Sequence, residues 1–228
     1  MKFPNRSGPK DNCQVALFDA VLWDFGGVFS ASPFTAVDAI AIERDIDPEI
    51  FREAIFGSYD QDGDHPWHRL ERGEIDFMAA REGIMDAARA RGFEADPIEL
   101  FMRMGEGGGI RDEVVEVATR IKSAGFQTAI VTNNAKEFRE RWVSLIPVDQ
   151  ICHEIVDSSE IGIRKPDPRI FEYALEKLGG VNAERAIFVD DYPANVDAAN
   201  ALGLRGVLMD EDYGVALAEI RDLIGWKD

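Results

Sequence analysis

Four residues that could do chemistry stand at the ends of short apolar runs. Asp24, Thr132 and the pair Asp190-Asp191 each follow directly on a run of strand length. A carboxylate is ionised at neutral pH and can act as a nucleophile, and neighbouring carboxylates offer the hard oxygen atoms that Mg²⁺ prefers. Loops at the carboxyl ends of parallel strands gather at one crevice of an open α/β sheet, so we expect these side chains to converge. Each residue alone would be explained by a turn or by strand propensity, so the prediction depends on the whole set.

The elements that would position these residues alternate between strand and helix over the second half of the chain. From Ile110 onward this alternation predicts a parallel sheet with crossover helices. The predicted strands are 20–23, 128–131, a short segment near 155–156, 186–189 and 206–209. The first predicted helix has an apolar face from Ile110 to Ile121 and stops at Gly125. A second covers 138–145, and a third begins at the cap Asp167-Pro168 and ends at Gly179-Gly180. The last two cover 193–202 and 215–224.

An all-helical insert separates the first strand from this alternating part. Apolar residues recur at three-to-four spacing over 48–57, 74–92 and 97–104, with no convincing strand between them. Glycines then break the pattern at 105 and 107–109, and no Lys-Ser or Lys-Thr follows to make a phosphate loop, so we interpret them as a hinge. The sequence predicts an α/β core of residues 1–31 and 108–228, interrupted by a helical domain of residues 32–107.

Composition limits the classes of partner. The 228 residues, 46% of them hydrophobic, suit one core domain that carries an insertion. A formal charge of -18 disfavours nucleic acid and anionic membranes as partners. The same charge opposes phosphate, so a phosphate site would need a local cluster of cation, lysine and backbone N–H groups.

The cysteines and the N-terminus indicate a compartment. Cys13 and Cys152 are too few for a disulfide framework and have no metal-ligand spacing, which favours a reducing cytoplasm. The apolar run that follows the basic N-terminal residues is interrupted at Asp19 and Asp24. We therefore expect neither a signal peptide nor a membrane span.

Four segments in order resemble motifs one to four of the haloacid dehalogenase superfamily. They are LWDFGGV at 22–28, IVTNN at 130–134, RKP at 164–166 and IFVDDYPANVDAANALG at 187–203. The resemblance implies a Rossmann-like parallel sheet core flanked by helices, with the helical insert as a cap domain. The segment HPWHRLERGEI at 65–75 is similar to caps of the phosphatase-like branch, which includes the epoxide hydrolase N-terminal domain and glucose-1-phosphatase relatives.

The resemblance implies a Mg²⁺-dependent hydrolase of a small organic phosphate. Asp24 would be the nucleophile, and an aspartyl-phosphate would divide one difficult hydrolysis into two displacements. In the family the position of Asp190 binds the metal directly. Asp24 and the backbone carbonyl of Gly26 would complete the protein ligands, while Asp191 would bind the metal through water or orient its neighbour, because adjacent carboxylates need a compensating cation.

Other residues would bind the phosphate. Lys165 would neutralise both Asp24 and the arriving phosphate, while Thr132 and the backbone N–H of Asn133 would donate hydrogen bonds to phosphate oxygens. Asn195 either donates to the substrate from the helix after the fourth motif or merely occupies the first turn of that helix. Asn134 is equally well explained as the N-cap of the next helix and is left out of the predicted site.

The sequence departs from the family pattern at Gly26. Phosphatases of the superfamily usually place a second Asp there, which protonates the leaving alkoxide. We first expect a phosphatase whose substrate has a good leaving group or that uses another proton donor. A 2-haloacid dehalogenase, whose halide leaves unprotonated, is the second alternative, although those relatives usually carry a Tyr at this position and need no metal. The third is a non-catalytic binding or regulatory protein on the same fold.

Two histidines of the insert are candidates for the missing proton donor. A histidine ordinarily titrates near neutral pH, but packing or hydrogen bonding within the insert is the better explanation of His65 and His68, since only a position over Asp24 would favour catalysis. Trp67 is better explained as part of the insert's core than as a substrate platform. Phe18-Asp19-Ala20 resembles a first motif but lacks the glycine turn, so Asp24 remains the predicted nucleophile. The sequence leaves open which phosphorylated molecule is the substrate and the oligomeric state.

Overall fold

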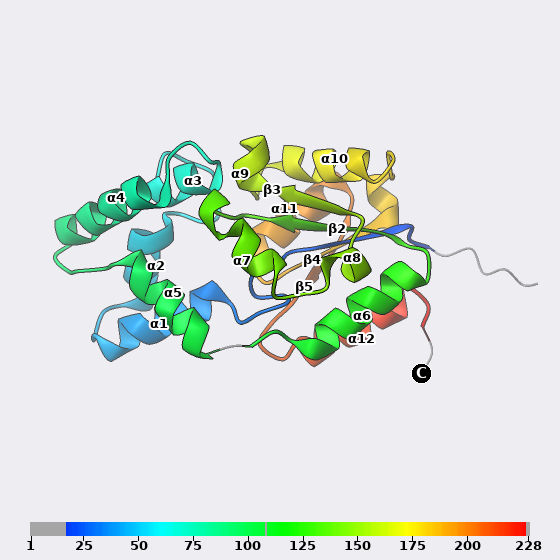
Figure 1. The fold of residues 1–228 in the computed structure, drawn as a ribbon, viewed down its shortest axis with the longest axis horizontal. Helices are drawn as coiled ribbons and strands as arrows, with labels where there is room; N and C mark the ends of the chain where they lie inside the picture. The colour runs from blue at the N-terminus through cyan, green and yellow to red at the C-terminus, as the bar shows by residue number, and fades with distance from the viewer. Residues whose placement is uncertain (1–16, 108, 227–228) are drawn as a thin grey trace, which may run out of the picture.

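A five-stranded parallel sheet forms the centre of the protein. The computed structural model describes residues 17–107 and 109–226. Figure 1 shows the sheet and its helices, with strand order β3-β2-β1-β4-β5. The strands are β1 (Ala20–Trp23), β2 (Gln127–Thr132), β3 (Glu154–Asp157), β4 (Ala186–Asp190) and β5 (Arg205–Leu208). The predicted α/β architecture is therefore confirmed, and each expected strand lies within two residues of its predicted bounds.

Alternate residues of the strands face opposite layers of helices. Val21 and Trp23 belong to the apolar cluster on one face, whereas Ala20 and Leu22 belong to the cluster on the other. This alternation follows from the two-residue period of a strand. Since all four side chains are fully buried, β1 is covered on both faces, as expected for the central strand of a parallel sheet.

Crossover helices cover both faces. One face packs against α6 (Asp112–Ser123), α7 (Arg139–Val143), α8 (Val148–Ile151) and α12 (Tyr213–Leu223), and the other against α10 (Pro168–Lys177) and α11 (Pro193–Leu202). The short elements η1 (Lys136–Phe138), α9 (Ser158–Ile161) and η2 (Ala183–Arg185) lie in the connections. The predicted cap at Asp167 is present, because its carboxylate accepts a hydrogen bond from the N–H of Arg169 at 3.0 Å.

Five helices fill the segment between β1 and β2. They are α1 (Pro33–Glu43), α2 (Pro48–Phe56), α3 (Pro66–Glu71), α4 (Phe77–Ala90) and α5 (Pro97–Gly107), and they gather at the left of Figure 1 around an apolar cluster of their own. Among the described residues, no helix has both the length and the apolar composition of a membrane span.

The end of α5 corrects one expectation. The helix was expected to end at Met104, where the glycines begin, but it continues to Gly107. A glycine lowers helix propensity by only about 1 kcal/mol and still adopts helical backbone angles, so it weakens the last turn without ending it. Gly108 lies outside the described residues, as does Cys13. Cys152 is a buried free thiol.

Candidate active site

Three carboxylates meet where the central strands end. Asp24 directly follows β1, Asp190 is the last residue of β4, and the N–H of Asp24 donates to the carbonyl of Val189 at 2.8 Å. The register pairs Trp23 with Val189. The next residues, Asp24 and Asp190, therefore lie side by side at the carboxyl ends of the two strands. Asp24, Asp190 and Asp191 each offer an oxygen atom, and these atoms all lie within 4.8 Å of one another.

Lys165 lies between two of these carboxylates. Its Nζ is 2.7 Å from Oδ1 of Asp24 and 2.6 Å from Oδ2 of Asp190, and the side chain is only 1% exposed. Burial acts to lower the pKa of Lys165, but the charges of Asp190 and Asp24 outweigh it and raise the pKa overall. The lysine is therefore a fixed positive charge in direct contact with the predicted nucleophile.

Asn133 holds the backbone of Lys165. Its Oδ1 accepts a hydrogen bond from the N–H of Lys165 at 2.7 Å, and its Nδ2 donates to the carbonyl of the same residue at 3.0 Å. The sequence analysis predicted a role for the backbone N–H of Asn133 but none for its side chain. That prediction depended only on the position of Asn133 in the second motif. The structure shows that its side chain links the loop after β2 to the loop that carries Lys165.

Asp190 is oriented by two donors besides the lysine. The N–H of Tyr192 donates to Oδ1 of Asp190 at 2.8 Å, and Nδ2 of Asn195 lies 3.1 and 3.2 Å from its two oxygens. Asn195 is buried. The structure thus places this amide against a carboxylate, where it fixes the orientation of Asp190 rather than projecting towards a substrate.

The cluster has an excess of negative charge. Burial is the main cause that raises the pKa of Asp24, to about 7; Lys165 acts to lower this pKa and the charge of Asp190 acts to raise it. Burial and the charges of Asp190 and Asp24 raise the pKa of Asp191 to about 8. Three carboxylates with one lysine favour a divalent cation that would offset the repulsion, and hard oxygen donors suit Mg²⁺. The donor set fits that ion.

The glycine turn after Asp24 allows the chain to come close to this cluster. Gly27 has a φ of 75°, and a Cβ there would lie 2.0 Å from Oδ2 of Asp191, so only glycine is tolerated. Gly26 differs, because its φ is not in the left-handed region and a Cβ would meet only Cδ of Pro33, at 3.7 Å. The backbone at Gly26 therefore has room for a side chain that the sequence lacks.

An apolar cavity of about 440 Å³ opens beside the cluster. Gly26, Thr132 and Asn133 form part of its wall. The rest is mainly apolar and comes from both the core and the inserted helices, including Phe25, Trp67, Leu100, Phe101, Phe138 and Trp142. Trp67 therefore belongs both to the core of the inserted helices and to the cavity wall.

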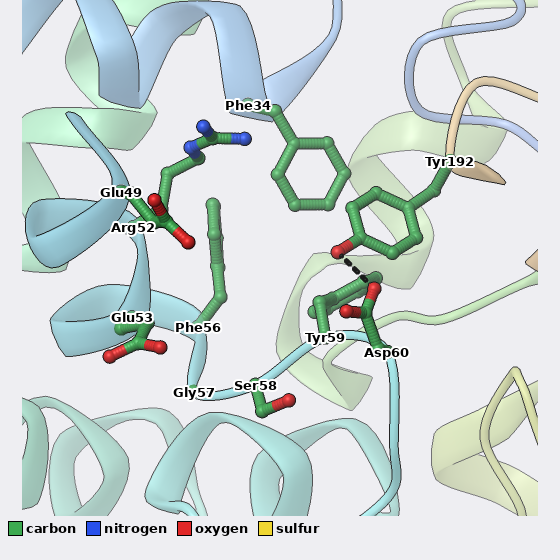
Figure 2. A pocket seen from close by; sticks show the side chains of 10 residues that line it. All are labelled: Phe34, Glu49, Arg52, Glu53, Phe56, Gly57, Ser58, Tyr59, Asp60 and Tyr192. Carbon is green, nitrogen blue, oxygen red and sulfur yellow. Dashed lines mark hydrogen bonds between the residues drawn. The ribbon is translucent and has the colours of Figure 1, made fainter. Parts of the chain in front are cut away.

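Two other cavities lie on the side of Tyr192. One of about 400 Å³ reaches Asp191 and also contacts Arg52 and Arg111. The other, of about 150 Å³, is drawn in Figure 2, where the hydroxyl of Tyr192 donates to Oδ1 of Asp60 at 2.8 Å. This hydrogen bond joins the core to the loop after α2.

A buried ion pair joins the inserted helices to the loop of Lys165. Nε of Arg164 donates to Oε2 of Glu71 at 2.7 Å, and Arg164 is 0% exposed. Oε1 of Glu71 accepts from the hydroxyl of Tyr59 and from Nε1 of Trp67, both at 2.8 Å. The sequence reasoning missed this network, although Arg164 precedes Lys165 in the third motif and Glu71 lies in the segment 65–75.

The two histidines contact other residues of the inserted helices. Nδ1 of His65 accepts from the N–H of Trp67 at 3.2 Å and so caps α3, and the ring of His68 lies 5.7 Å from that of His65. Burial lowers the pKa of His65 to about 4 and that of His68 to about 3. Both rings are therefore neutral at physiological pH, which does not suit a proton donor.

The fold and the ordered motifs define the class of protein. A family model described as haloacid dehalogenase-like hydrolase matches residues 18–203, and the chain belongs to this family. Two solved structures share its fold. One is a HAD-family enzyme of Bacteroides thetaiotaomicron in complex with magnesium and inorganic phosphate, with 18% identity, a TM-score of 0.57 and coverage of 86% of this chain and 96% of that one. The other is a dehalogenase, with 22% identity, a TM-score of 0.64 and coverage of 93% and 100%.

Curated relatives carry different activities. The chain is 28% identical to mouse acyl-CoA dehydrogenase family member 10 over 92% of its own length and 19% of that protein's length. It is 25% identical to mouse bifunctional epoxide hydrolase 2 over 93% of its own length and 39% of that protein's. It is also 24% identical to phosphoglycolate phosphatase of Colwellia psychrerythraea, with 86% and 85% covered. The chain thus spans well under half the length of the first two relatives.

Proposed function

We propose that the protein is a Mg²⁺-dependent phosphatase that hydrolyses small phosphate monoesters through an aspartyl-phosphate on Asp24. The observation that carries the proposal is the contact of Lys165 with both Asp24 and Asp190, at 2.7 and 2.6 Å, beside a third carboxylate. Lysine and a cation together would supply the positive charge that a phosphoryl group needs in a protein with a formal charge of -18.

The reaction would proceed in two displacements. A carboxylate oxygen of Asp24 attacks phosphorus, the bond from phosphorus to the ester oxygen breaks, and that oxygen leaves with the electron pair. Water then attacks the phosphorus of the aspartyl-phosphate, which releases inorganic phosphate and a proton and regenerates the carboxylate. Lys165 would favour the ionised form of Asp24, both before the attack and when the carboxylate is regenerated. Thr132 and the N–H of Asn133 would donate hydrogen bonds to phosphoryl oxygens.

The metal ligands would be Asp24, Asp190, Asp191 and the carbonyl of Gly26. A Mg²⁺ ion bound there would neutralise phosphoryl oxygens and favour the ionised form of the carboxylates. Asn195 would keep Asp190 in its liganding orientation. The Bacteroides thetaiotaomicron enzyme of the same fold, which was solved with magnesium and phosphate, supports this choice of ion.

We further propose that residues 32–107 act as a cap over a core of residues 1–31 and 108–228. The supporting observation is that the 440 Å³ cavity has walls from both parts. The ion pair of Glu71 with Arg164 and the hydrogen bond of Tyr192 to Asp60 connect the two parts on different sides. Substrate choice would then depend on side chains of the inserted helices.

One observation also favours a dehalogenase. Gly26 provides no carboxyl to protonate a leaving group, and a halide leaves without a proton. The cluster of three carboxylates argues the other way, because the carboxylate of a haloacid would meet like charge there unless a cation were bound. Release of chloride from 2-chloropropionate without Mg²⁺ would favour this second candidate.

The deciding experiment is a panel of phosphate monoesters assayed with and without Mg²⁺. We expect release of inorganic phosphate that depends on Mg²⁺ and falls at least about 10³-fold in Asp24→Asn, which removes the nucleophile and keeps the size of the side chain. Asp19→Asn is the matched control, because Asp19 pairs with Arg185 at the opposite end of β1. Activity that survives in Asp24→Asn would exclude the covalent route.

A further inference from the structure

The cavity beside Gly26 has an aromatic wall that the chemistry of phosphate does not require. The rings of Phe25 and Trp142 lie 4.7 Å apart, and those of Phe101 and Phe138 lie 4.4 Å apart, all four lining the cavity. Aromatic side chains favour offset or edge contacts with another ring. The cavity is therefore suited to a flat apolar group that lies next to the phosphoryl site.

The size of the cavity limits what it can hold. A cavity of roughly 150 Å³ holds one benzene molecule, so about 440 Å³ has room for a group of two fused rings. Gly26, Thr132 and Asn133 line the cavity and also belong to the phosphoryl site proposed above. A monoester would thus place its phosphorus at Asp24 and its organic group among the rings.

The cavity also lacks an available proton donor for the leaving oxygen. Of the described residues that line it, Glu71 alone has a carboxyl group. The oxygens of Glu71 already accept hydrogen bonds from Tyr59, Trp67 and Arg164, so both are engaged within the protein. A leaving group in this cavity must depart as an anion.

We propose that the substrates are aryl phosphates, whose ring occupies the cavity and whose oxygen leaves as an aryloxide. A phenol ionises at about pH 10, as tyrosine does, whereas an alkyl alcohol resembles water and loses its proton far less readily. Attack by Asp24 breaks the bond from phosphorus to the aryl oxygen, and the aryloxide takes its proton from solvent after release. The inference rests on the proposed phosphatase function and adds to it the class of the organic group.

The test compares esters that separate ring binding from leaving-group chemistry. Phenyl and benzyl phosphate both carry one ring, but only the first releases an aryloxide. We expect kcat/KM for phenyl phosphate to exceed that for benzyl phosphate by at least about 100-fold, since general acid catalysis is worth about 10² to 10⁴. Equal values for the two esters would overturn the proposal.

Two variants sharpen the test. Gly26→Asp adds a carboxyl where the backbone has room, and we expect it to reduce the phenyl-to-benzyl ratio at least tenfold. Gly109 lines the cavity, and a Cβ there meets no atom within 4 Å, so the backbone has room for the side chain of Gly109→Phe at the cavity wall. We expect its kcat/KM for 1-naphthyl phosphate to fall at least tenfold relative to that for acetyl phosphate, which has no ring.

The outcomes separate the two levels of the proposal. If acetyl phosphate is hydrolysed and Gly109→Phe leaves the naphthyl-to-acetyl ratio unchanged, the ring does not bind in this cavity and the aryl class is wrong. If none of the esters is hydrolysed in the presence of Mg²⁺, the phosphatase function fails and the aryl proposal fails with it. Circular dichroism of each variant establishes that the fold is retained.

Discussion

Substitution in the ion pair of Arg164 with Glu71 should cost more stability than most single substitutions in this protein. Arg164 is 0% exposed and the side chain of Glu71 is 4% exposed, so neither charge can turn to water. We consider Arg164→Met, which keeps an unbranched apolar stem and removes the charge. The variant leaves the carboxylate of Glu71 buried with only the donors from Tyr59 and Trp67.

The expected loss is large for a single substitution. Removing one partner of a buried ion pair costs about 3–5 kcal/mol, because the other charge stays buried without compensation. In a domain of this size about 1 kcal/mol corresponds to roughly 2–4 °C in Tm, so we expect Tm to fall by about 6–20 °C. Glu71→Gln added to Arg164→Met should recover at least about 1 kcal/mol, since the glutamine leaves no stranded charge.

Urea unfolding followed by circular dichroism measures these differences. Arg89→Met is the matched control, because Arg89 pairs with Asp86 on the surface, where the two side chains are 47% and 66% exposed. An exposed pair contributes about 0–1 kcal/mol, so the control should remain close to the parent protein. A loss below about 1 kcal/mol in Arg164→Met, or no recovery in the double variant, would refute the reasoning.

Three further predictions concern the carboxylate cluster and the inserted helices. In EDTA, the free energy of unfolding should fall as the pH rises from 3.8 to about 8. Burial raises the pKa of Asp24 to about 7 and that of Asp191 to about 8, from an ordinary value of 3.8. In this pH range the folded protein keeps protons that the unfolded chain releases. Mg²⁺ should restore stability at the upper end, and a urea midpoint independent of pH would contradict this. Asn195→Ala should weaken Mg²⁺ binding about 10- to 100-fold in calorimetry, because Asp190 loses the amide that orients its carboxylate. Unchanged affinity would show that Asp190 does not need this amide. His68→Leu should keep turnover within about twofold, since a pKa of about 3 leaves the ring neutral, whereas a hundredfold loss would identify His68 as the proton donor.

Local patterns were enough to predict the elements of the core. The apolar run at 20–23 and the helix at 193–202 have the bounds that the sequence predicted, since burial on both faces and the Pro and Gly at the helix ends act within a few residues. The end of α5 was less predictable, because glycine only lowers the stability of a helical turn and does not forbid it.

The sequence by itself determined which residues could form the site. Once strands that precede Asp24, Thr132 and Asp190 are recognised as parallel, the geometry of such a sheet requires their carboxyl ends to share one edge. The resemblance of the first motif to the family likewise implied that the second Asp is replaced by Gly26. These conclusions need only the order of motifs along the chain.

Only the tertiary structure decided how these residues are supported. The ion pair of Glu71 with Arg164 joins residues 93 positions apart, and the hydrogen bond of Asn133 with Lys165 joins residues 32 positions apart. The low pKa of His68 and the aromatic cavity likewise come from segments that pack together across the molecule. No local periodicity encodes such contacts, because burial and distance between remote side chains arise only when the whole chain has folded.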